Sequence, residues 1–418
     1  MEPTKNERGE INVGVGFVTG RRSFRKVLKT YMYRWREASA DIKKRVNLHL
    51  FVAYDLDYLN THVDDYVNIK PEVLSCLDGV SFIGQSMIEQ ECKELVDEGV
   101  LTQDEADLMF GKGYAGKRNI ILYYALKKHM DYLIFLDDDE YPLAVTKTRH
   151  VALWSGQSVL TDHLKYLSGA DMTNGYHCGY ISPIPHIDFN EALTEGDFRT
   201  FIEAISNDIL EWDKLKQIMD NNGVTYASTQ VLMENAAFEV PETNNAKFIS
   251  GSNLGINLKN IHMVKPFYNP PGARGEDTFL STCLAGHKLM RIPSYTFHDG
   301  FSSYGYLLDG VLPLQLKPIS AIDENVKARF YRACIGWIRY KPLYLYITKP
   351  QQFKEEIAGI RAKLAESVPK LSAYFDNPQF SKVISEFNYY TRQVKSHYQS
   401  FLDNQKTWDK CKTYLFRI

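Results

Sequence analysis

The sequence lacks any long apolar run. No stretch of about 18 consecutive apolar residues occurs, so no segment is expected to cross a membrane as a helix. The first ten residues, MEPTKNERGE, are charged and polar and do not have the apolar core of a signal peptide. These absences predict a cytoplasmic protein and leave peripheral contact with a membrane surface open.

Cysteine pairs and an excess of one charge are also lacking. The net charge is −2, which provides no overall field for nucleic acid, and no nucleic-acid partner is expected. None of the six cysteines is spaced as C-x-x-C, which argues against a zinc site. Their scattered positions fit free thiols in a reducing compartment. They are Cys76, Cys92, Cys178, Cys283, Cys334 and Cys411.

Strand and helix patterns alternate through the first 300 residues. This alternation predicts an α/β fold with a mostly parallel sheet flanked by helices. The expected strands cover 11–18, 47–54, 80–83, 132–136, 171–184, 247–256 and 289–297. The expected helices cover 23–35, 89–109, 118–128, 201–219 and 276–285.

Two later segments depart from this alternation. Residues 188–245 look like a helical insertion between two strands, and the strand signals fade after about residue 315. Phe353, Ile357, Ile360 and Leu364 share one helical face in this tail. The predicted division is a catalytic-type domain over 1–314 and a helical C-terminal subdomain over 315–418. Both later segments carry aromatic residues, and we expect both to meet a second substrate or simply to cover the sheet.

The acidic run at Asp137–Glu140 carries the strongest chemical signal. It follows Tyr132–Leu136 (YLIFL), an apolar run of strand length. Ligands of open α/β sheets bind at the carboxyl ends of the strands. Clustered carboxylates there are typical of a site for magnesium or manganese shared with substrate phosphates. The alternative is a solvated acidic turn.

Three further pieces accompany the acidic run. Residues 111–119 (GKGYAGKRN) are glycine-rich and basic and open a helix, which suits a diphosphate. Arg274-Gly275-Glu276-Asp277 places two acids at a helix start, where they either stabilise the first turn or act as a general base. His298, at the end of a late strand, is either a structural residue or a metal ligand.

In this order and at this spacing, the four pieces resemble the GT-A class of nucleotide-sugar glycosyltransferases. The G-x-A-x-x-R-N segment followed by a helix and FLDDD is similar to the large inverting family of polysaccharide-synthase-type glycosyltransferases. The resemblance covers about residues 11–300. It implies a GT-A, Rossmann-like fold and transfer of a sugar from a nucleoside diphosphate, UDP by family frequency, to a hydroxyl acceptor. The acceptor would be a glycan, a small molecule or a lipid-linked molecule.

The resemblance also implies a metal site and a nucleotide site. Asp137 and Asp139 match the ends of the family's DXD motif, and His298 matches a late metal-binding histidine. Asp139 and His298 would hold Mn²⁺ or Mg²⁺, and Asp137 would bind either this metal or the donor ribose. Asp55 would hydrogen-bond the nucleotide base, with Asp57 as the alternative. The residues expected to bind the donor nucleotide are Thr19, Asp55, Asp57, Lys117, Arg118, Asp137 and Asp138.

The acceptor chemistry follows from two other matches. Gly251-Ser252-Asn253 falls where such enzymes line the donor-sugar pocket. Glu276-Asp277 matches the family's ED pair, with Asp277 as the catalytic base. In an inverting reaction Asp277 would take the proton of the acceptor hydroxyl.

The sequence departs from the family in its first loop, which reads VTGRRSF instead of a proline-tyrosine-asparagine type loop. It also lacks the QxxRW motif of the processive members, which favours transfer of single sugars. A histidine ligand is typical of several retaining families, so a retaining reaction stays open.

Three other functions are compatible with parts of the pattern. A haloacid-dehalogenase-type phosphohydrolase also places D-x-D after an apolar strand. Its motif normally continues to a threonine or valine, where this chain has Tyr141. A sugar nucleotidyltransferase carries a glycine-rich basic loop after its first strand, of which Gly20-Arg21-Arg22 is a poor version. A carbohydrate-binding scaffold with a decayed site is the non-enzymatic alternative.

Overall fold

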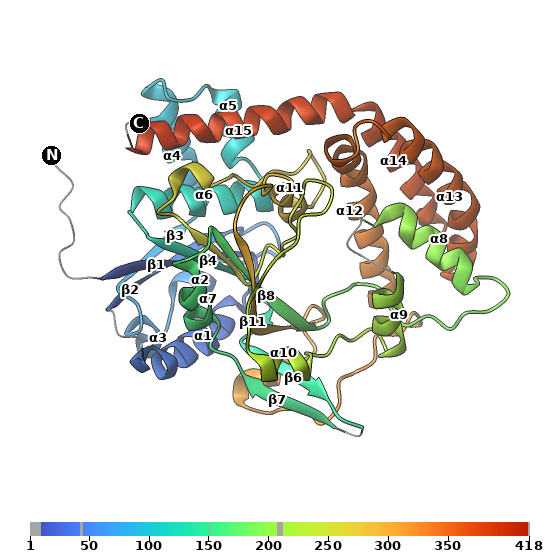
Figure 1. Ribbon diagram of the computed structural model, residues 1–418, viewed down its shortest axis with the longest axis horizontal. Helices are drawn as coiled ribbons and strands as arrows, with labels where there is room; N and C mark the ends of the chain where they lie inside the picture. Colours follow the sequence, from blue (N-terminus) through green and yellow to red (C-terminus); the bar gives the residue numbers. More distant parts are fainter. Residues whose placement is uncertain (1–9, 42–44, 150, 207–211, 417–418) are drawn as a thin grey trace.

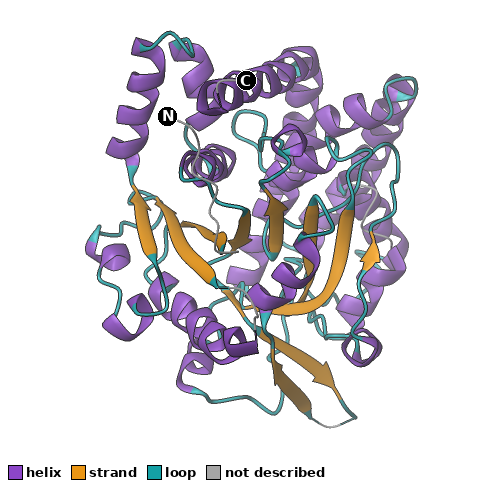
Figure 2. Cartoon of the chain, turned by 60° about the vertical axis from the view of Figure 1, so that its left-hand side comes forward, coloured by secondary structure: helices purple, strands orange, loops and turns teal. Residues whose placement is uncertain are grey.

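The computed structural model describes residues 10–41, 45–149, 151–206 and 212–416. Within these residues the chain forms a nine-stranded sheet and a separate hairpin, which projects from the sheet in Figure 2. The sheet contains β1 (Ile11–Thr19), β2 (Val46–Tyr54), β3 (Gly79–Ile83), β4 (Tyr132–Leu136), β5 (Glu140–Tyr141), β8 (Met172–Gly179), β9 (Phe238–Glu239), β10 (Leu254–Asn257) and β11 (Leu289–His298). The hairpin contains β6 (Leu143–Lys147) and β7 (Ala152–Gly156).

The predicted α/β fold is confirmed, but the sheet is mixed instead of mostly parallel. Its order is β3-β2-β1-β4-β10-β8-β11-β5, with β9 paired to β11. The strands β3, β2, β1 and β4 are parallel, and β8 pairs parallel with β11. In contrast, β10 is antiparallel to both β4 and β8. The apolar pattern of a buried strand does not specify its direction, so the sequence could not show this reversal.

The helices cover both faces of the sheet (Figure 1). The α-helices are α1 (Phe24–Ala38), α2 (Asp64–Val67), α3 (Pro71–Leu74), α4 (Gln85–Asp97), α5 (Gln103–Phe110), α6 (Tyr114–Lys127), α7 (Val159–Leu167), α8 (Glu195–Ile205), α9 (Trp212–Asp220), α10 (Thr229–Glu234), α11 (Glu276–Ser281), α12 (Glu324–Thr348), α13 (Phe353–Tyr374), α14 (Lys382–Arg392) and α15 (Val394–Phe416). Short 3₁₀ helices are η1 (Ser39–Asp41), η2 (Ile261–Met263), η3 (Gly305–Asp309) and η4 (Pro378–Ser381).

Two helices expected as single segments are divided. The segment 89–109 covers most of α4 and of α5, which are separate helices because Gly99 adopts a left-handed φ of +70° and Thr102 then caps a new helix. The Thr102 hydroxyl accepts a hydrogen bond from the Glu105 backbone N–H at 3.3 Å. The segment 201–219 contains the end of α8 and all but the last residue of α9, and its residues 207–211 lie outside the described part.

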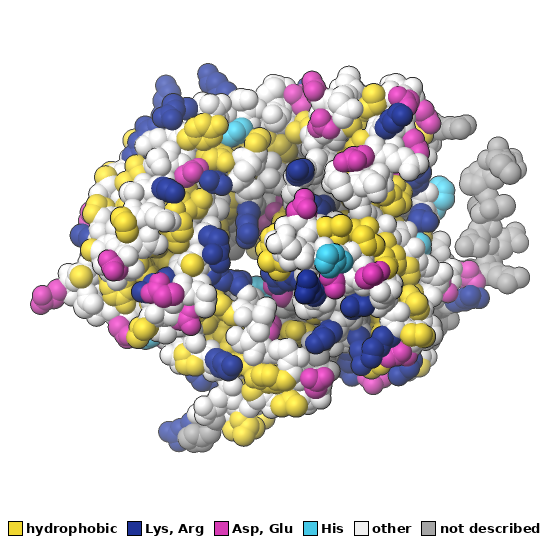
Figure 3. Space-filling model, turned by 180° about the vertical axis from the view of Figure 1, so that it is seen from behind, with side chains coloured by type: hydrophobic (Ala, Val, Ile, Leu, Met, Phe, Trp, Pro, Cys, Tyr) yellow, Lys and Arg dark blue, Asp and Glu magenta, His cyan; other side chains and the backbone are white. Residues whose placement is uncertain are grey.

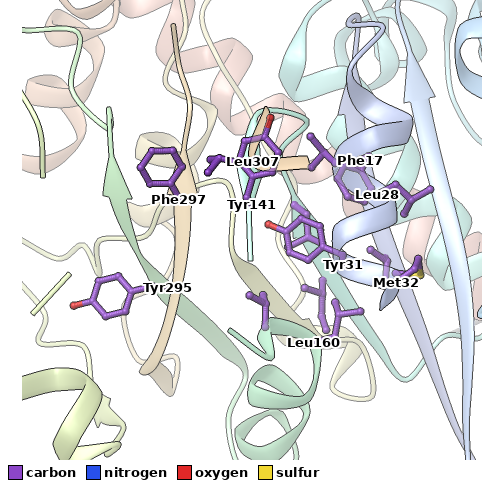
Figure 4. Packing of buried hydrophobic residues seen from close by; sticks show 14 of the residues in the cluster. Phe17, Leu28, Tyr31, Met32, Tyr141, Leu160, Tyr295, Phe297 and Leu307 are labelled. Atoms are coloured by element: carbon purple, nitrogen blue, oxygen red, sulfur yellow. The ribbon is translucent and has the colours of Figure 1, made fainter. Parts of the chain in front are cut away.

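Successive side chains of β1 point to opposite faces of the sheet, and each face has its own apolar core. Phe17 packs with α1 and with η3 on one face, in the cluster shown in Figure 4. On the other face, a methyl group at Gly16 would lie 3.0 Å from Ile121 of α6. Glycine at this position therefore lets α6 approach the sheet closely, and α6 begins beside the ends of the central strands.

The helical tail after residue 315 is confirmed. Its helices α12, α13 and α14 share a third apolar core with α8 from the predicted insertion. Ile357, Ile360 and Leu364 are buried in this core, as their spacing predicted. The last helix, α15, runs back across α5 and α6 on their side away from the sheet (Figure 1), and its Trp408 is buried in the core that α5 and α6 share with the sheet. No helix in the described residues has a segment long and apolar enough to cross a bilayer.

Candidate active site

The carboxyl ends of β1, β2 and β4 bring the first group of predicted residues together. Since these strands are parallel and adjacent, the residues that end them lie at the same edge of the sheet. Thr19 ends β1, Asp55 follows β2, and Asp137–Asp139 follows β4. The Thr19 hydroxyl donates to Asp138 Oδ2 at 2.6 Å, and both groups are buried. This contact fixes the middle carboxylate, so Asp138 supports the site from within the protein.

Asp55 lines a hollow of about 380 Å³ together with Thr19 and Lys117. Lys117 Nζ lies 2.8 Å from Asp55 Oδ2. Burial raises the pKa of Asp55, but the hydrogen bond and charge of Lys117 outweigh burial and bring the pKa below its ordinary value. Asp57 is exposed, and its backbone N–H donates to Asp55 Oδ1 at 3.1 Å. Of the two predicted base-binding residues, Asp55 is the one that faces the hollow.

Arg118 connects three of the predicted motifs. Its side chain is 3% exposed and lies against the rings of Phe135 and Phe267. The guanidinium donates to the carbonyl of Gly251, and its Nη2 lies 3.2 Å from Asp137 Oδ1. Its Nε lies 3.5 Å from Glu276 Oε1.

These contacts are made with groups of the protein itself, although Nε makes no hydrogen bond and Arg118 also lines the space over the acidic run. The arginine therefore positions the acidic run after β4, the Gly251 loop and the start of α11 relative to one another. This arrangement favours a positioning role over the direct contact with the nucleotide base or diphosphate that the sequence suggested.

Asp139 and His298 lie side by side in the acidic cluster. His298 Nε2 is 3.4 Å from Asp139 Oδ2, and its Nδ1 lies 2.7 Å from the Tyr180 carbonyl oxygen. Burial lowers the pKa of His298, but the charge of Asp139 outweighs burial and raises it to about 9. Arg21 contacts the same carboxylate and lies 3.6 Å from Asp138 Oδ1. Both cations hold the pKa of Asp139 well below its ordinary range, against the effect of burial.

Asp139 and His298 fit a divalent cation, whereas Asp137 fits less well. Nδ1 of His298 faces a backbone carbonyl, which leaves Nε2 as the metal-binding atom. Two ligands of one cation are about 3 Å apart, close to the separation observed here. Asp137 instead faces Arg118, and no group of three or more His, Cys, Asp or Glu side chains suited to a metal occurs among the described residues. The remaining positions of a metal would have to come from substrate or water.

Asp277 lies in a second, larger hollow of about 1220 Å³. Burial, and then the adjacent charge of Glu276, raise the pKa of Asp277 to about 6. Gly275, which precedes α11, has a left-handed φ of +99°, and a methyl group there would lie 2.9 Å from Tyr340. Glycine therefore allows α12 to approach the start of α11, and Asp277 faces the space between them.

The predicted donor-sugar triplet is mostly turned into the protein. Asn253 is fully buried, and its side-chain amide donates to the carbonyls of Tyr176 and Ser294, both at 3.1 Å. Ser252 is also buried, and its hydroxyl donates to Glu140 Oε2 at 2.9 Å. Because both side chains are occupied by protein partners, Ser250, which lines the large hollow, is better placed to meet a sugar.

Three hollows form one connected site. A third hollow, of about 200 Å³, lies over Asp137, Asp138 and Asp139. All three hollows share residues in their walls, which places them next to one another. These shared residues are Tyr58, Arg274 and Glu276.

The tail forms one wall of the large hollow. Arg329, Ala333, Gly336 and Tyr340 of α12 line it at helical spacing, so one face of α12 lies along the space. The described residues of 188–245 do not line it. Trp212 in that segment instead packs against Phe198, inside the third core.

Sequence reasoning missed several residues that line the site. Arg21 belongs to the VTGRRSF loop, and its unusual sequence was the only signal for it. Tyr58 lines all three hollows, but an exposed tyrosine after a strand has no distinctive pattern. Arg329 and Arg332 reach the site from more than 180 residues beyond the acidic run, so only the tertiary fold identifies them.

Comparison with known proteins gives no family for the chain: no family model matches the sequence, and no curated protein matches it.

Proposed function

We propose that the chain is a metal-dependent glycosyltransferase of GT-A type, which transfers a single sugar from a nucleoside diphosphate donor to a hydroxyl acceptor. The observation that carries this proposal is the set of three connected hollows at the carboxyl edge of the sheet. One contains Asp55, one the acidic run, and one Asp277. These hollows would take the nucleoside, the diphosphate and the acceptor in turn, and UDP is the favoured nucleotide.

The position of Asp277 supports an inverting reaction. Asp277 lines the large hollow, whereas Glu276 lines all three. A base that faces the acceptor space is placed to take the proton of the attacking hydroxyl. Its raised pKa, about 6, lets it accept a proton near neutral pH and still be ionised beforehand. Glu276 stays bound to Arg118 and orients the start of α11.

Asp139 and His298 would hold the metal, Mn²⁺ or Mg²⁺. Bound there, the ion would neutralise charge on the diphosphate leaving group. Arg21 already contacts Asp139, so the arginine and a cation would compete for that carboxylate. Lys117 and the Asp57 backbone N–H fix the two oxygens of Asp55 at the wall of the nucleoside hollow.

The first test is donor binding. We expect UDP to bind with Mn²⁺ present and to bind much more weakly in EDTA, because the acidic run repels phosphate unless a cation intervenes. Calorimetry with UDP and GDP, each with Mn²⁺ and with EDTA, measures this difference. Equal affinity in EDTA would contradict the metal site, and no affinity for either nucleotide would contradict the donor site.

A second prediction concerns the two metal ligands. Asp139→Asn and His298→Ala should each weaken Mn²⁺-dependent UDP binding by on the order of tenfold or more, because each removes one of the protein donors. The matched controls are Asp104→Asn and His262→Ala, which alter exposed residues that line none of the three hollows. Calorimetric titration of all four variants is the measurement. UDP binding in the ligand variants equal to that of the controls would show that the cation binds elsewhere.

A further inference from the structure

Arginine side chains dominate the charge of the large hollow. Five of them line it, against the two carboxylates of Glu276 and Asp277. The five are Arg21, Arg22, Arg274, Arg329 and Arg332. The space-filling view from behind shows Lys and Arg side chains gathered around a hollow near the middle of this face (Figure 3).

Two of these arginines are neutralised by the protein. Arg21 contacts Asp139, and Arg22 lies 3.5 Å from Asp65. The other three have no carboxylate partner among the described residues. These are Arg274, Arg329 and Arg332, and we call them the arginine triad.

Arg329 is the most enclosed member of the arginine triad, whereas Arg274 and Arg332 are exposed. Arg329 and Arg332 are one turn apart on α12. The Arg329 guanidinium lies 4.5 Å from the ring centre of Phe301, which fixes its orientation. The Arg274 side chain packs beside Gly336 of α12: a methyl group added at Gly336 would lie 3.8 Å from Cδ of Arg274. Burial lowers the pKa of Arg329, and the charges of Arg21, Arg274 and Arg332 lower it further, although Asp139 opposes them.

Three like charges close together in a partly enclosed space repel one another. An anion in that space removes the repulsion, and guanidinium groups bind phosphate oxygens in a planar, two-pronged geometry. A phosphate monoester carries up to two negative charges and a carboxylate only one. A phosphate therefore neutralises more of the positive charge of three unpaired arginines. The hollow of about 1220 Å³ is large enough to hold a sugar as well.

Arg329 and Arg332 line only the large hollow, whereas Arg274 also reaches the two smaller ones. Arg329 also lies near Asp139 and His298, since its charge acts on both. Because the proposed function gives the large hollow to the acceptor, an anion held there by Arg329 and Arg332 would belong to the acceptor and not to the donor diphosphate. Resting on the proposed function, we infer that the acceptor carries a phosphate group, which the arginine triad binds while the acceptor hydroxyl faces Asp277. The phosphate belongs either to a free phosphorylated glycan or to a lipid headgroup, and the experiment distinguishes these sources.

Binding assays on the full chain test the inference. The soluble probes are glucose 6-phosphate, glucuronate and glucose, titrated into protein with and without saturating UDP and Mn²⁺. We expect glucose 6-phosphate to bind more tightly than glucuronate or glucose. The double variant Arg329→Gln/Arg332→Gln should reduce its affinity by on the order of 100-fold, about tenfold for each arginine. Lys327→Gln removes a cation of α12 that lies outside the hollow and should leave the affinity unchanged.

Cosedimentation with phosphatidylcholine vesicles, with and without phosphatidic acid, is the lipid arm. Sedimentation with phosphatidic acid that the double variant loses would assign the phosphate to a lipid headgroup. Tight binding of glucose 6-phosphate alone would assign it to a free phosphorylated glycan. Phosphate binding in neither arm, or binding that the double variant retains, would overturn the inference.

Measurement of UDP affinity in the same variants separates this inference from the proposed function. The double variant should bind UDP and Mn²⁺ as the wild type does, and an equal loss of UDP and glucose 6-phosphate would place these arginines in the donor site and overturn the inference. If the wild type binds glucose 6-phosphate through the triad but never binds UDP, the proposed function fails while the anion site stands.

Discussion

Asp277→Asn should lower the rate of sugar transfer by on the order of two to four powers of ten, because it removes the base that accepts the hydroxyl proton. Its affinity for UDP with Mn²⁺ should stay at the wild-type value. Asp277 faces the large hollow and is absent from the walls of the two smaller ones. The loss therefore belongs to the transition state and not to donor binding. Release of UDP with acceptor present measures the rate, and calorimetry measures the affinity.

The pH profile provides an independent readout of the same group. Burial raises the pKa of Asp277 to about 6, and a base works only in its ionised form. The wild-type rate should therefore fall as the pH drops through about 6. In Asp277→Asn the part of this limb that belongs to Asp277 should disappear, since asparagine does not titrate. A limb that stays would belong to Asp138, whose pKa burial also raises to about 6.

Two results would contradict this assignment. A loss of UDP affinity in Asp277→Asn as large as that in Asp139→Asn would place Asp277 in the donor site. A transfer rate close to that of the wild type would mean that Asp277 only orients a substrate, as in a retaining reaction. Asp104→Asn is the matched control for the substitution itself, because Asp104 is exposed at the start of α5.

The parts of the fold that could be predicted are those in which local pattern and tertiary environment agree. Tyr132–Leu136 was predicted as a strand with the bounds that β4 has, because five apolar residues between polar ones leave little choice. The helix break at Gly99 could have been predicted too, since a T-x-x-E capping signal follows it at Thr102. The direction of β10 could not, because it depends on the path of the chain between distant strands.

The candidate site shows the same division. The position of Asp55, Asp137–Asp139 and His298 at or just after strand ends could be predicted from the sequence, because the sheet itself fixes residues at these positions. Asn253 was expected to meet a sugar, but the fold encloses its amide between two carbonyls and His163. The arginine triad and Arg21 could not be anticipated, since their proximity depends on how α12 and the first loop pack against the sheet.

Arg118→Met should destabilise the protein strongly, because it leaves the carboxylates of Asp137 and Glu276 without their buried cationic partner. Arg118 is 3% exposed, whereas the partners Asp137 and Glu276 are 33% and 15% exposed. Removal of one member of a buried ion pair typically destabilises a protein by about 3–5 kcal/mol. Because Asp137 keeps some contact with solvent, we expect about 3 kcal/mol. Urea denaturation of the variant and the wild type measures the loss.

The companion variants show whether unpaired charge is the reason. Arg118→Met/Glu276→Gln also removes the carboxylate of Glu276, which Arg118→Met leaves without a partner, and should recover part of the stability. If Arg118→Met acted only through lost packing, the second substitution would recover nothing. Arg118→Lys should recover little, because an ammonium group cannot reach Gly251, Asp137 and Glu276 together as the guanidinium does. A stability of Arg118→Met equal to that of the wild type would refute the positioning role. If the role is correct, transfer should also fall in every variant that breaks these contacts, since Arg118 links the acidic run to the helix that carries Asp277.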